Sequence, residues 1–169
     1  MINILKIIFQ RITIKIINIF LSGTHFFRIK RFLLNVSGYK IGKNSKVVGP
    51  LNITGKLIVG DNCWIGKDLY ILGNGTVILG NNCDIAPCVT FATGGHEIGD
   101  SKRRAGDGRV FNITVKDGCW IGTRVTVINS VTINESSVIG AGALVNKNIE
   151  KNVVAGGIPA KTIKKLEGE

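Results

Sequence analysis

Two histidines and four cysteines are the side chains in this sequence best suited to proton transfer or nucleophilic chemistry. His96 follows a Gly94-Gly95 pair and precedes a polar stretch. An imidazole changes charge near neutral pH, so it can take the proton of an attacking hydroxyl. His25 lies beside two phenylalanines in a basic N-terminal segment, and we interpret it as structural. A lone histidine is most often structural, so the role of His96 depends on the elements that position it.

The cysteines predict packing rather than catalysis or metal binding. Cys63, Cys83 and Cys119 occupy one recurring position in the sequence, and Cys88 lies off it. A small apolar side chain pointing inward suits that recurring position. Two histidines without a Cys-x-x-C pair do not form a zinc signature, and the spacing indicates no disulfide framework. We expect no metal, and reduced thiols are typical of a cytoplasmic protein.

The charge of the chain is concentrated at one end. The 169 residues suffice for one domain, 44% of them are hydrophobic, and the net charge is +11. Residues 1–60 contain ten Lys or Arg and no acidic residue, whereas residues 61–169 contain twelve Lys or Arg and eleven Asp or Glu. This split argues against a nucleic-acid partner for the whole chain and predicts an arm that faces an anionic surface such as a membrane.

Residues 1–21 are rich in isoleucine but do not have the pattern of a spanning helix. Lys6, Arg11 and Lys15 interrupt the stretch. Each basic residue costs roughly 2.5–3.5 kcal/mol at the centre of a spanning helix. No small-residue cleavage site follows, so we expect no secretory signal.

The same stretch has the pattern of an amphipathic helix. Basic amphipathic helices lie on anionic lipid, and a second basic, apolar piece covers residues 26–36. Two alternatives stay open: both pieces pack on the rest of the protein or on a partner subunit, and residues 11–16 also alternate like a strand. We therefore predict a basic amphipathic helical segment at residues 1–38. The apolar arc on the helical wheel contains Leu5, Ile8, Phe9, Ile12, Ile16, Ile19 and Phe20.

An internal repeat of six residues dominates the rest of the chain. Sixteen positions in this register carry a large apolar side chain, with one two-residue slip near the turn-prone residues 73–75. A period of six fits short strands joined by tight corners, and three such faces make a triangular coil of 18 residues. The positions are Ile41, Val47, Ile53, Val59, Ile65, Ile71, Val77, Leu79, Ile85, Phe91, Val115, Ile121, Val127, Ile133, Ile139 and Val145.

One stretch breaks the repeat. In residues 97–114 the register positions are Glu97, Arg103 and Arg109, none of them apolar. We therefore predict an all-β solenoid at residues 39–158 with an extruded, flexible loop at 97–114. A long loop in a compact repeat is usually functional. For residues 159–169 we expect a C-terminal tail with a short helix.

Six phrases in the repeat region stand out. They are Ile85-Ala-Pro-Cys-Val-Thr90, Thr93-Gly-Gly-His-Glu97, Lys102-Arg-Arg-Ala-Gly106, Asp117-Gly-Cys-Trp-Ile-Gly122, Ser137-Val-Ile-Gly-Ala-Gly142 and Val153-Val-Ala-Gly-Gly-Ile-Pro-Ala-Lys161. In these phrases residues 41–166 resemble the hexapeptide-repeat acyltransferases, in particular the maltose and galactoside O-acetyltransferases and their relatives in surface-polysaccharide gene clusters. The resemblance implies a left-handed parallel β-helix and a homotrimer.

The resemblance also implies a chemistry. His96 would be the general base in a direct transfer of an acyl group from coenzyme A, without an acyl-enzyme. Asn146 stands where the family commonly has a hydroxyl residue. The alternative roles are an aromatic cover for Trp120 and simple solubility for the last lysines. The residues implied in the coenzyme A groove are Trp120, Thr123, Ala141, Lys147, Ala160 and Lys161, with Lys164 and Lys165 near the phosphates.

Acidic and basic side chains near His96 are candidates on the acceptor side. Asp84 and Glu97 either orient His96, bind acceptor hydroxyls or are solvated corner carboxylates, and the last reading is favoured for Asp68. Arg104, with Arg103, matches a basic pair of the family's loop and either binds the acceptor or fixes the loop.

These observations predict a cytoplasmic, acetyl-CoA-dependent O-acetyltransferase. The expected acceptor is a carbohydrate hydroxyl on a surface-polysaccharide or lipid-linked precursor at the inner face of the membrane. Two alternatives stay open: an enzyme that acetylates serine or an antibiotic hydroxyl, and a non-catalytic structural β-helix.

Overall fold

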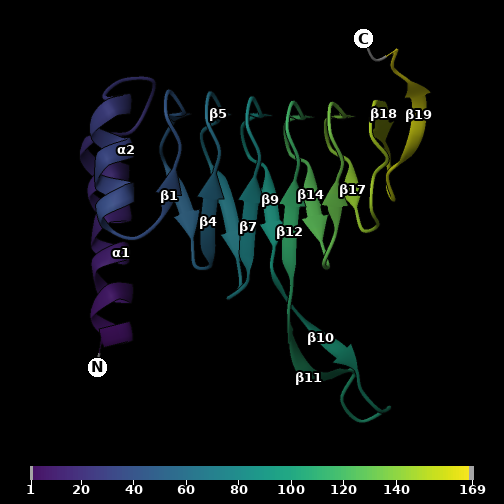
Figure 1. The fold of residues 1–169 in the computed structure, drawn as a ribbon. Helices are drawn as coiled ribbons and strands as arrows, with labels where there is room; N and C mark the ends of the chain where they lie inside the picture. The colour runs from purple at the N-terminus through teal and green to yellow at the C-terminus, as the bar shows by residue number, and fades with distance from the viewer. Residues whose placement is uncertain (1, 168–169) are drawn as a thin grey trace.

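The computed structural model describes residues 2–167, and its side chains from residue 4 onward. Met1 and the last two residues of the predicted C-terminal tail lie outside this range. Helices α1 (Ile2–Phe20) and α2 (Phe27–Val36) come first and lie against the N-terminal end of a parallel β-solenoid (Figure 1). The helical prediction for residues 1–38 therefore agrees with the structure, and the strand alternative for residues 11–16 is wrong.

The solenoid has three walls, which its coils visit in turn. Wall 1 contains β1 (Lys40–Ile41), β4 (Lys56–Val59), β7 (Thr76–Leu79), β12 (Asn112–Val115) and β15 (Thr132–Ile133). Wall 2 contains β2 (Lys46–Val47), β5 (Trp64–Ile65), β8 (Asp84–Ile85), β13 (Trp120–Ile121), β16 (Val138–Ile139), β18 (Val153–Gly156) and β19 (Lys161–Lys165). Wall 3 contains β3 (Leu51–Ile53), β6 (Leu69–Leu72), β9 (Thr90–Ala92), β14 (Thr126–Ile128) and β17 (Leu144–Val145).

The core is the predicted column of apolar side chains. All sixteen register positions are buried, the most exposed being Ile53 at 9%. Adjacent coils pair these positions directly, for example Ile41 with Val59 in wall 1. The predicted two-residue slip is also confirmed: Ile53 pairs with Ile71 at a spacing of 18, and Val59 with Leu79 at a spacing of 20. Because each strand has only one or two inward residues, the six-residue period specifies these inward positions. Other buried residues, such as Leu69, Val89 and Ile113, lie outside the register.

The three recurring cysteines lie at the corner between walls 1 and 2. Cys63, Cys83 and Cys119 are each at most 2% exposed. Each thiol lies within hydrogen-bond distance of a carbonyl oxygen in the next coil, at 3.0, 3.1 and 3.0 Å respectively. The packing interpretation of these cysteines fits this arrangement.

Polar side chains form a ladder along the outside of the same corner. Asp61 accepts a hydrogen bond from the Lys43 N–H, Asn81 from the Asp61 N–H at 2.8 Å, and Asp117 from the Asn81 N–H at 2.8 Å. The Asn81 amide also donates to the other Asp117 oxygen at 3.1 Å. The ladder thus provides acceptors for backbone N–H groups at the corner, which are not part of the strand pairing.

Replacing Asp117 with Asn should make the stability of the solenoid less sensitive to acid. The hydrogen bonds that Asp117 accepts from Asn81 hold the pKa of its carboxyl below the ordinary 3.8. The ionised carboxylate is therefore more favourable in the folded than in the unfolded chain, and it stabilises the fold at pH values above 3.8. This stabilisation is lost as the pH falls through the pKa of the folded state. Urea unfolding between neutral pH and pH ~3 measures the effect. Asp107→Asn on the hairpin is the matched control, and an equal change in both variants would contradict the assignment.

The two helices close the open end of the solenoid through two asparagines. The Asn18 side chain donates to the Leu51 carbonyl and accepts from the Leu51 N–H, both at 2.8 Å. The Asn35 side chain makes the same pair with Ile41, at 3.0 and 2.7 Å. A side-chain amide offers one donor and one acceptor, so each asparagine replaces the neighbouring strand that the first coil lacks.

Helix α1 packs on the first coil through its more polar side. Thr13 and Ile17 are 2% and 0% exposed. By contrast, every residue of the predicted apolar arc is at least 39% exposed, Ile16 being the lowest. The arc therefore does not pack on the coils of its own chain.

The predicted loop at residues 97–114 is an ordered β-hairpin with different bounds. Strands β10 (Gly94–Ile98) and β11 (Ala105–Val110) pair antiparallel and project from the corner between walls 3 and 1 (Figure 1). Residues 112–114 already belong to β12 in wall 1, where Ile113 is fully buried. The segment is extruded, as expected, but it forms two strands rather than a loop without structure, because the polar segment satisfies its own backbone by strand pairing.

The expected short C-terminal helix is also wrong. Residues Lys161–Lys165 form β19, which pairs antiparallel with β18. The last parallel strand of a solenoid leaves an edge of unpaired backbone groups, and the returning chain covers it.

Candidate active site

His96 lies on β10, directly opposite Gly108 of β11, and its side chain is exposed. Its Nδ1 atom is 2.9 Å from the carbonyl oxygen of Gly106. A carbonyl oxygen can only accept, so Nδ1 carries the proton in the neutral ring and Nε2 keeps its lone pair. The hairpin therefore holds the imidazole in the tautomer that a general base needs. Sequence reasoning missed Gly106, because a backbone carbonyl has no side-chain signature.

Glu97 is engaged elsewhere. Its carboxylate lies 3.2 Å from Nε of Arg109, whose guanidinium stacks 5.5 Å from the centre of the Phe111 ring. The strand register shifts between His96 and Ile98, and Glu97 has no partner in the pairing of β10 with β11. In this arrangement the Gly106 carbonyl, rather than Glu97, orients His96.

Arg104 lies at the tip of the hairpin. Its Nη1 donates to the Gly99 carbonyl at 3.2 Å, and the Gly99 N–H donates back to the Arg104 carbonyl at 3.0 Å. Asp100 accepts from the N–H groups of Lys102 and Arg103 at 2.9 and 3.1 Å. Of the two roles considered for Arg104, these contacts correspond to fixing the loop.

Asp84 lies on wall 2, away from the hairpin. It is the strand neighbour of Trp64 on one side and of Trp120 on the other. Partial burial raises the pKa of its carboxyl. A carboxylate between two indole rings can accept hydrogen bonds from a polyol while the rings cover an apolar face. Asp68 lies nearby at the corner between walls 2 and 3, half-buried and with a φ of 56°.

Apart from Lys147, the predicted groove residues follow wall 2 and its corner with wall 3. Lys147 comes after β17 and lies at the corner between walls 3 and 1. Trp120 is 55% exposed on wall 2, and Thr123 and Ala141 are exposed at the corner. Thr123 Oγ1 donates to the Pro87 carbonyl at 2.8 Å. The C-terminal segment lies along the same edge, because the Ala160 N–H donates to the Leu144 carbonyl at 2.8 Å.

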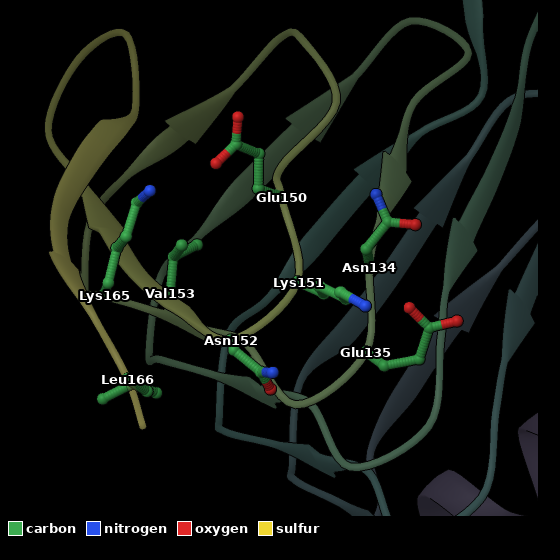
Figure 2. Close-up of a pocket in the computed structure, with 8 residues that line it drawn as sticks. All are labelled: Asn134, Glu135, Glu150, Lys151, Asn152, Val153, Lys165 and Leu166. Carbon is green, nitrogen blue, oxygen red and sulfur yellow. The ribbon is translucent and has the colours of Figure 1, made fainter. Parts of the chain in front are cut away.

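The predicted lysines divide into two groups. Lys147, Lys161 and Lys164 are exposed, and none belongs to an ion pair within the described part of the chain. Lys165 instead lines a pocket of about 510 Å³ that also contains Glu135 and Glu150 (Figure 2). The lining also includes Lys151, and it contains none of the other predicted site residues.

A single chain does not bring the predicted site together. His96, Glu97 and Arg104 lie on the hairpin at the corner between walls 3 and 1. Thr123 and Ala141 lie at the corner between walls 2 and 3, on the far side of wall 3. Among residues 2–167, moreover, no three His, Cys, Asp or Glu side chains cluster in a way that could hold a metal ion.

The chain is similar in sequence to curated acetyltransferases. The putative colanic acid biosynthesis acetyltransferase WcaF of Escherichia coli is 34% identical over 143 residues, which are 82% of this chain and 75% of that protein. The chain belongs to the hexapeptide-repeat acyltransferases. The left-handed coil of that family, which the resemblance implied, is therefore the handedness of this solenoid. No family model matches the chain.

Two further family members support the membership. The galactoside O-acetyltransferase of E. coli is 37% identical over 128 residues, which are 75% of this chain. This hexapeptide-repeat chain spans 63% of the length of that enzyme. A solved galactoside acetyltransferase in complex with coenzyme A superimposes with a TM-score of 0.80 at 29% identity, covering 96% of this chain and 81% of the other.

Proposed function

We propose that the protein transfers an acetyl group from acetyl-CoA to a hydroxyl of a carbohydrate. The observation that carries this proposal is the free Nε2 of His96, held on a projecting hairpin by the Gly106 carbonyl. Relatives named galactoside O-acetyltransferase and colanic acid biosynthesis acetyltransferase support the substrate class.

The residues along wall 2 fit coenzyme A. Small exposed side chains at Thr123 and Ala141 leave room for a pantetheine arm, and exposed lysines without an ion-pair partner suit its phosphates. When bound, acetyl-CoA supplies the activated acyl group. Nε2 of His96 takes the proton of the acceptor hydroxyl as its oxygen bonds to the acyl carbon, and returns it to the departing sulfur.

The acceptor residues belong to the same proposal. Asp84, placed between Trp64 and Trp120, would bind hydroxyls of the sugar. Glu97 and Arg104 would act indirectly, by holding the hairpin that carries His96. The expected acceptor is a polysaccharide or lipid-linked precursor at the inner face of the membrane, which the basic N-terminal segment would contact.

A homotrimer would complete the site. None of the residues in the five strands of wall 3 is charged, in a chain whose net charge is +11. A three-fold axis facing wall 3 would bring the hairpin corner of one subunit against the groove corner of the next. Ile98 and Val110 on the hairpin, 87% and 60% exposed, would pack on that neighbour.

An acceptor panel tests the reaction. The purified protein is incubated with acetyl-CoA and galactosides, glucosides, oligosaccharides, serine or an antibiotic alcohol, while released thiol is measured. We expect release that depends on a sugar, with one acetyl group added to that sugar by mass spectrometry. Release with serine or the antibiotic only would contradict the sugar assignment. No release and no binding of coenzyme A would indicate the non-catalytic scaffold.

A further inference from the structure

We infer that the outward surface of α1 and α2, here called the cap face, is a docking surface for an anionic lipid bilayer. Thirteen of the twenty large hydrophobic side chains that are exposed in the described chain belong to residues 4–36. Soluble monomers rarely expose so concentrated an apolar surface. The cap face consists of Leu5, Ile8, Phe9, Ile12, Ile16, Ile19 and Phe20 on α1, and Phe26, Ile29, Phe32 and Val36 on α2.

The cap face is free because the helices use their other sides to close the solenoid. On α1 the docking contacts come from Thr13, Ile17 and the Asn18 amide. On α2 they come from the buried Lys30 and Leu34. The Lys30 ammonium donates to the Gly23 carbonyl at 2.6 Å, so this basic side chain also lies on the inner side of α2. The inner side of the helices thus combines polar residues with fully buried Ile17 and Leu34, and the apolar residues of the cap face remain outside.

Basic side chains border the cap face. On the helical wheel, Arg11 and Lys15 flank the apolar arc of α1, and Arg28 flanks that of α2; all three are exposed. Beside α2, Arg28, Arg31 and Lys46 line an open pocket of about 570 Å³. An apolar face edged by cations matches the boundary between acyl chains and anionic headgroups, whose phosphates accept hydrogen bonds from arginine.

Charge also decides between a bilayer and a second copy of this chain. Residues 1–60 carry ten Lys or Arg and no acidic residue. Two cap faces brought together would place cations against cations with no local carboxylate to pair them. An anionic lipid surface instead supplies the missing negative charge.

The depth of binding follows from the helices themselves. Neither helix of the described chain is long and apolar enough to cross a membrane. The helices therefore lie in the interface, with the apolar arc toward the acyl chains. Because they lie across the end of the solenoid (Figure 1), the coils would point away from the bilayer. The proposed trimer, on which this step rests, would present three cap faces in one plane and so bind by avidity.

Vesicle sedimentation of the full chain tests the docking surface. The probes are vesicles of phosphatidylcholine alone and of phosphatidylcholine mixed with phosphatidylglycerol. The triple variant Ile12→Ser, Ile16→Ser, Phe20→Ser removes exposed side chains only, so folding should persist. We expect it to bind the mixed vesicles about 100-fold more weakly than the unchanged protein, because each lost side chain removes buried apolar area. Added salt should also weaken binding of the unchanged protein.

A matched variant controls for loss of apolar surface in general. Ile78→Ser, Ile163→Ser also removes exposed apolar side chains, but from wall 1 and β19, and should bind vesicles like the unchanged protein. Equal binding by the triple variant would overturn the inference, as would a smaller oligomer of that variant in light scattering, which would make the cap face a contact between copies. Acetyl transfer to a water-soluble sugar is measured separately, so failure of docking and failure of the proposed reaction are distinguishable.

Discussion

His96→Ala is expected to lower kcat for acetyl transfer by about 10²–10⁴-fold, the usual contribution of a positioned general base. The side chain is exposed on the hairpin, and its one hydrogen bond in the structure runs to the Gly106 carbonyl. Removing the ring therefore leaves the solenoid core untouched. The affinity for coenzyme A should be unchanged, because the predicted groove lies along wall 2.

The chain provides its own control for this variant. His25 is the other histidine and is also exposed, so His25→Ala should retain full activity. Steady-state thiol release measures kcat, and calorimetry measures coenzyme A affinity. If His96→Ala retained more than half of the activity, a different group would have to remove the acceptor proton. If it lost coenzyme A binding as well, His96 would belong to the groove rather than to proton transfer.

Mixing two inactive variants should restore activity. One variant is His96→Ala, and the other is Ala141→Trp, which fills the predicted groove at an exposed corner position. In random hybrid trimers, about a quarter of the composite sites would pair an intact His96 with an intact groove of the next subunit. The mixture should therefore recover about a quarter of the unchanged activity, far above either variant alone.

The recovery depends on subunit exchange and on the arrangement about wall 3. The variants are mixed, dissociated in mild denaturant and reassembled, and the trimer is verified by light scattering. Reassembly of each variant alone is the control and should yield no activity. Trimers that form without any recovered activity would place His96 and the groove in the same subunit. A protein that stays monomeric while active would exclude the composite site altogether.

The apolar arc of α1 could be predicted from the sequence, but what the arc contacts could not. The helical wheel identified the apolar arc of α1, and the structure leaves that arc exposed, with Ile16 its least exposed member at 39%. A helix that packs on a protein core and a helix that lies on a bilayer have the same pattern of apolar residues. Asn18 and Asn35 fix the inner side of the helices by replacing backbone partners that the first coil lacks. The fully buried Ile17 and Leu34 lie on that same side.

The six-residue period predicted the solenoid, sixteen of its core positions and the place of the two-residue slip. It could do so because each short strand buries a fixed register position against the same position in the next coil, so a local period specifies the tertiary contact. The structure of segments outside this period could not be predicted in the same way. The hairpin at Gly94–Val110 and strand β19 depend on pairing between backbones, which carries no side-chain periodicity.

Tertiary structure alone decided what the candidate site residues touch. His96 is oriented by a backbone carbonyl, Glu97 is paired with Arg109, and wall 3 separates the hairpin from the groove. Residue types and spacing do not predict these contacts, because the contacts form between segments that only the fold brings together. The sequence therefore named the groups that could react, and the folded chain determined which partners each one has.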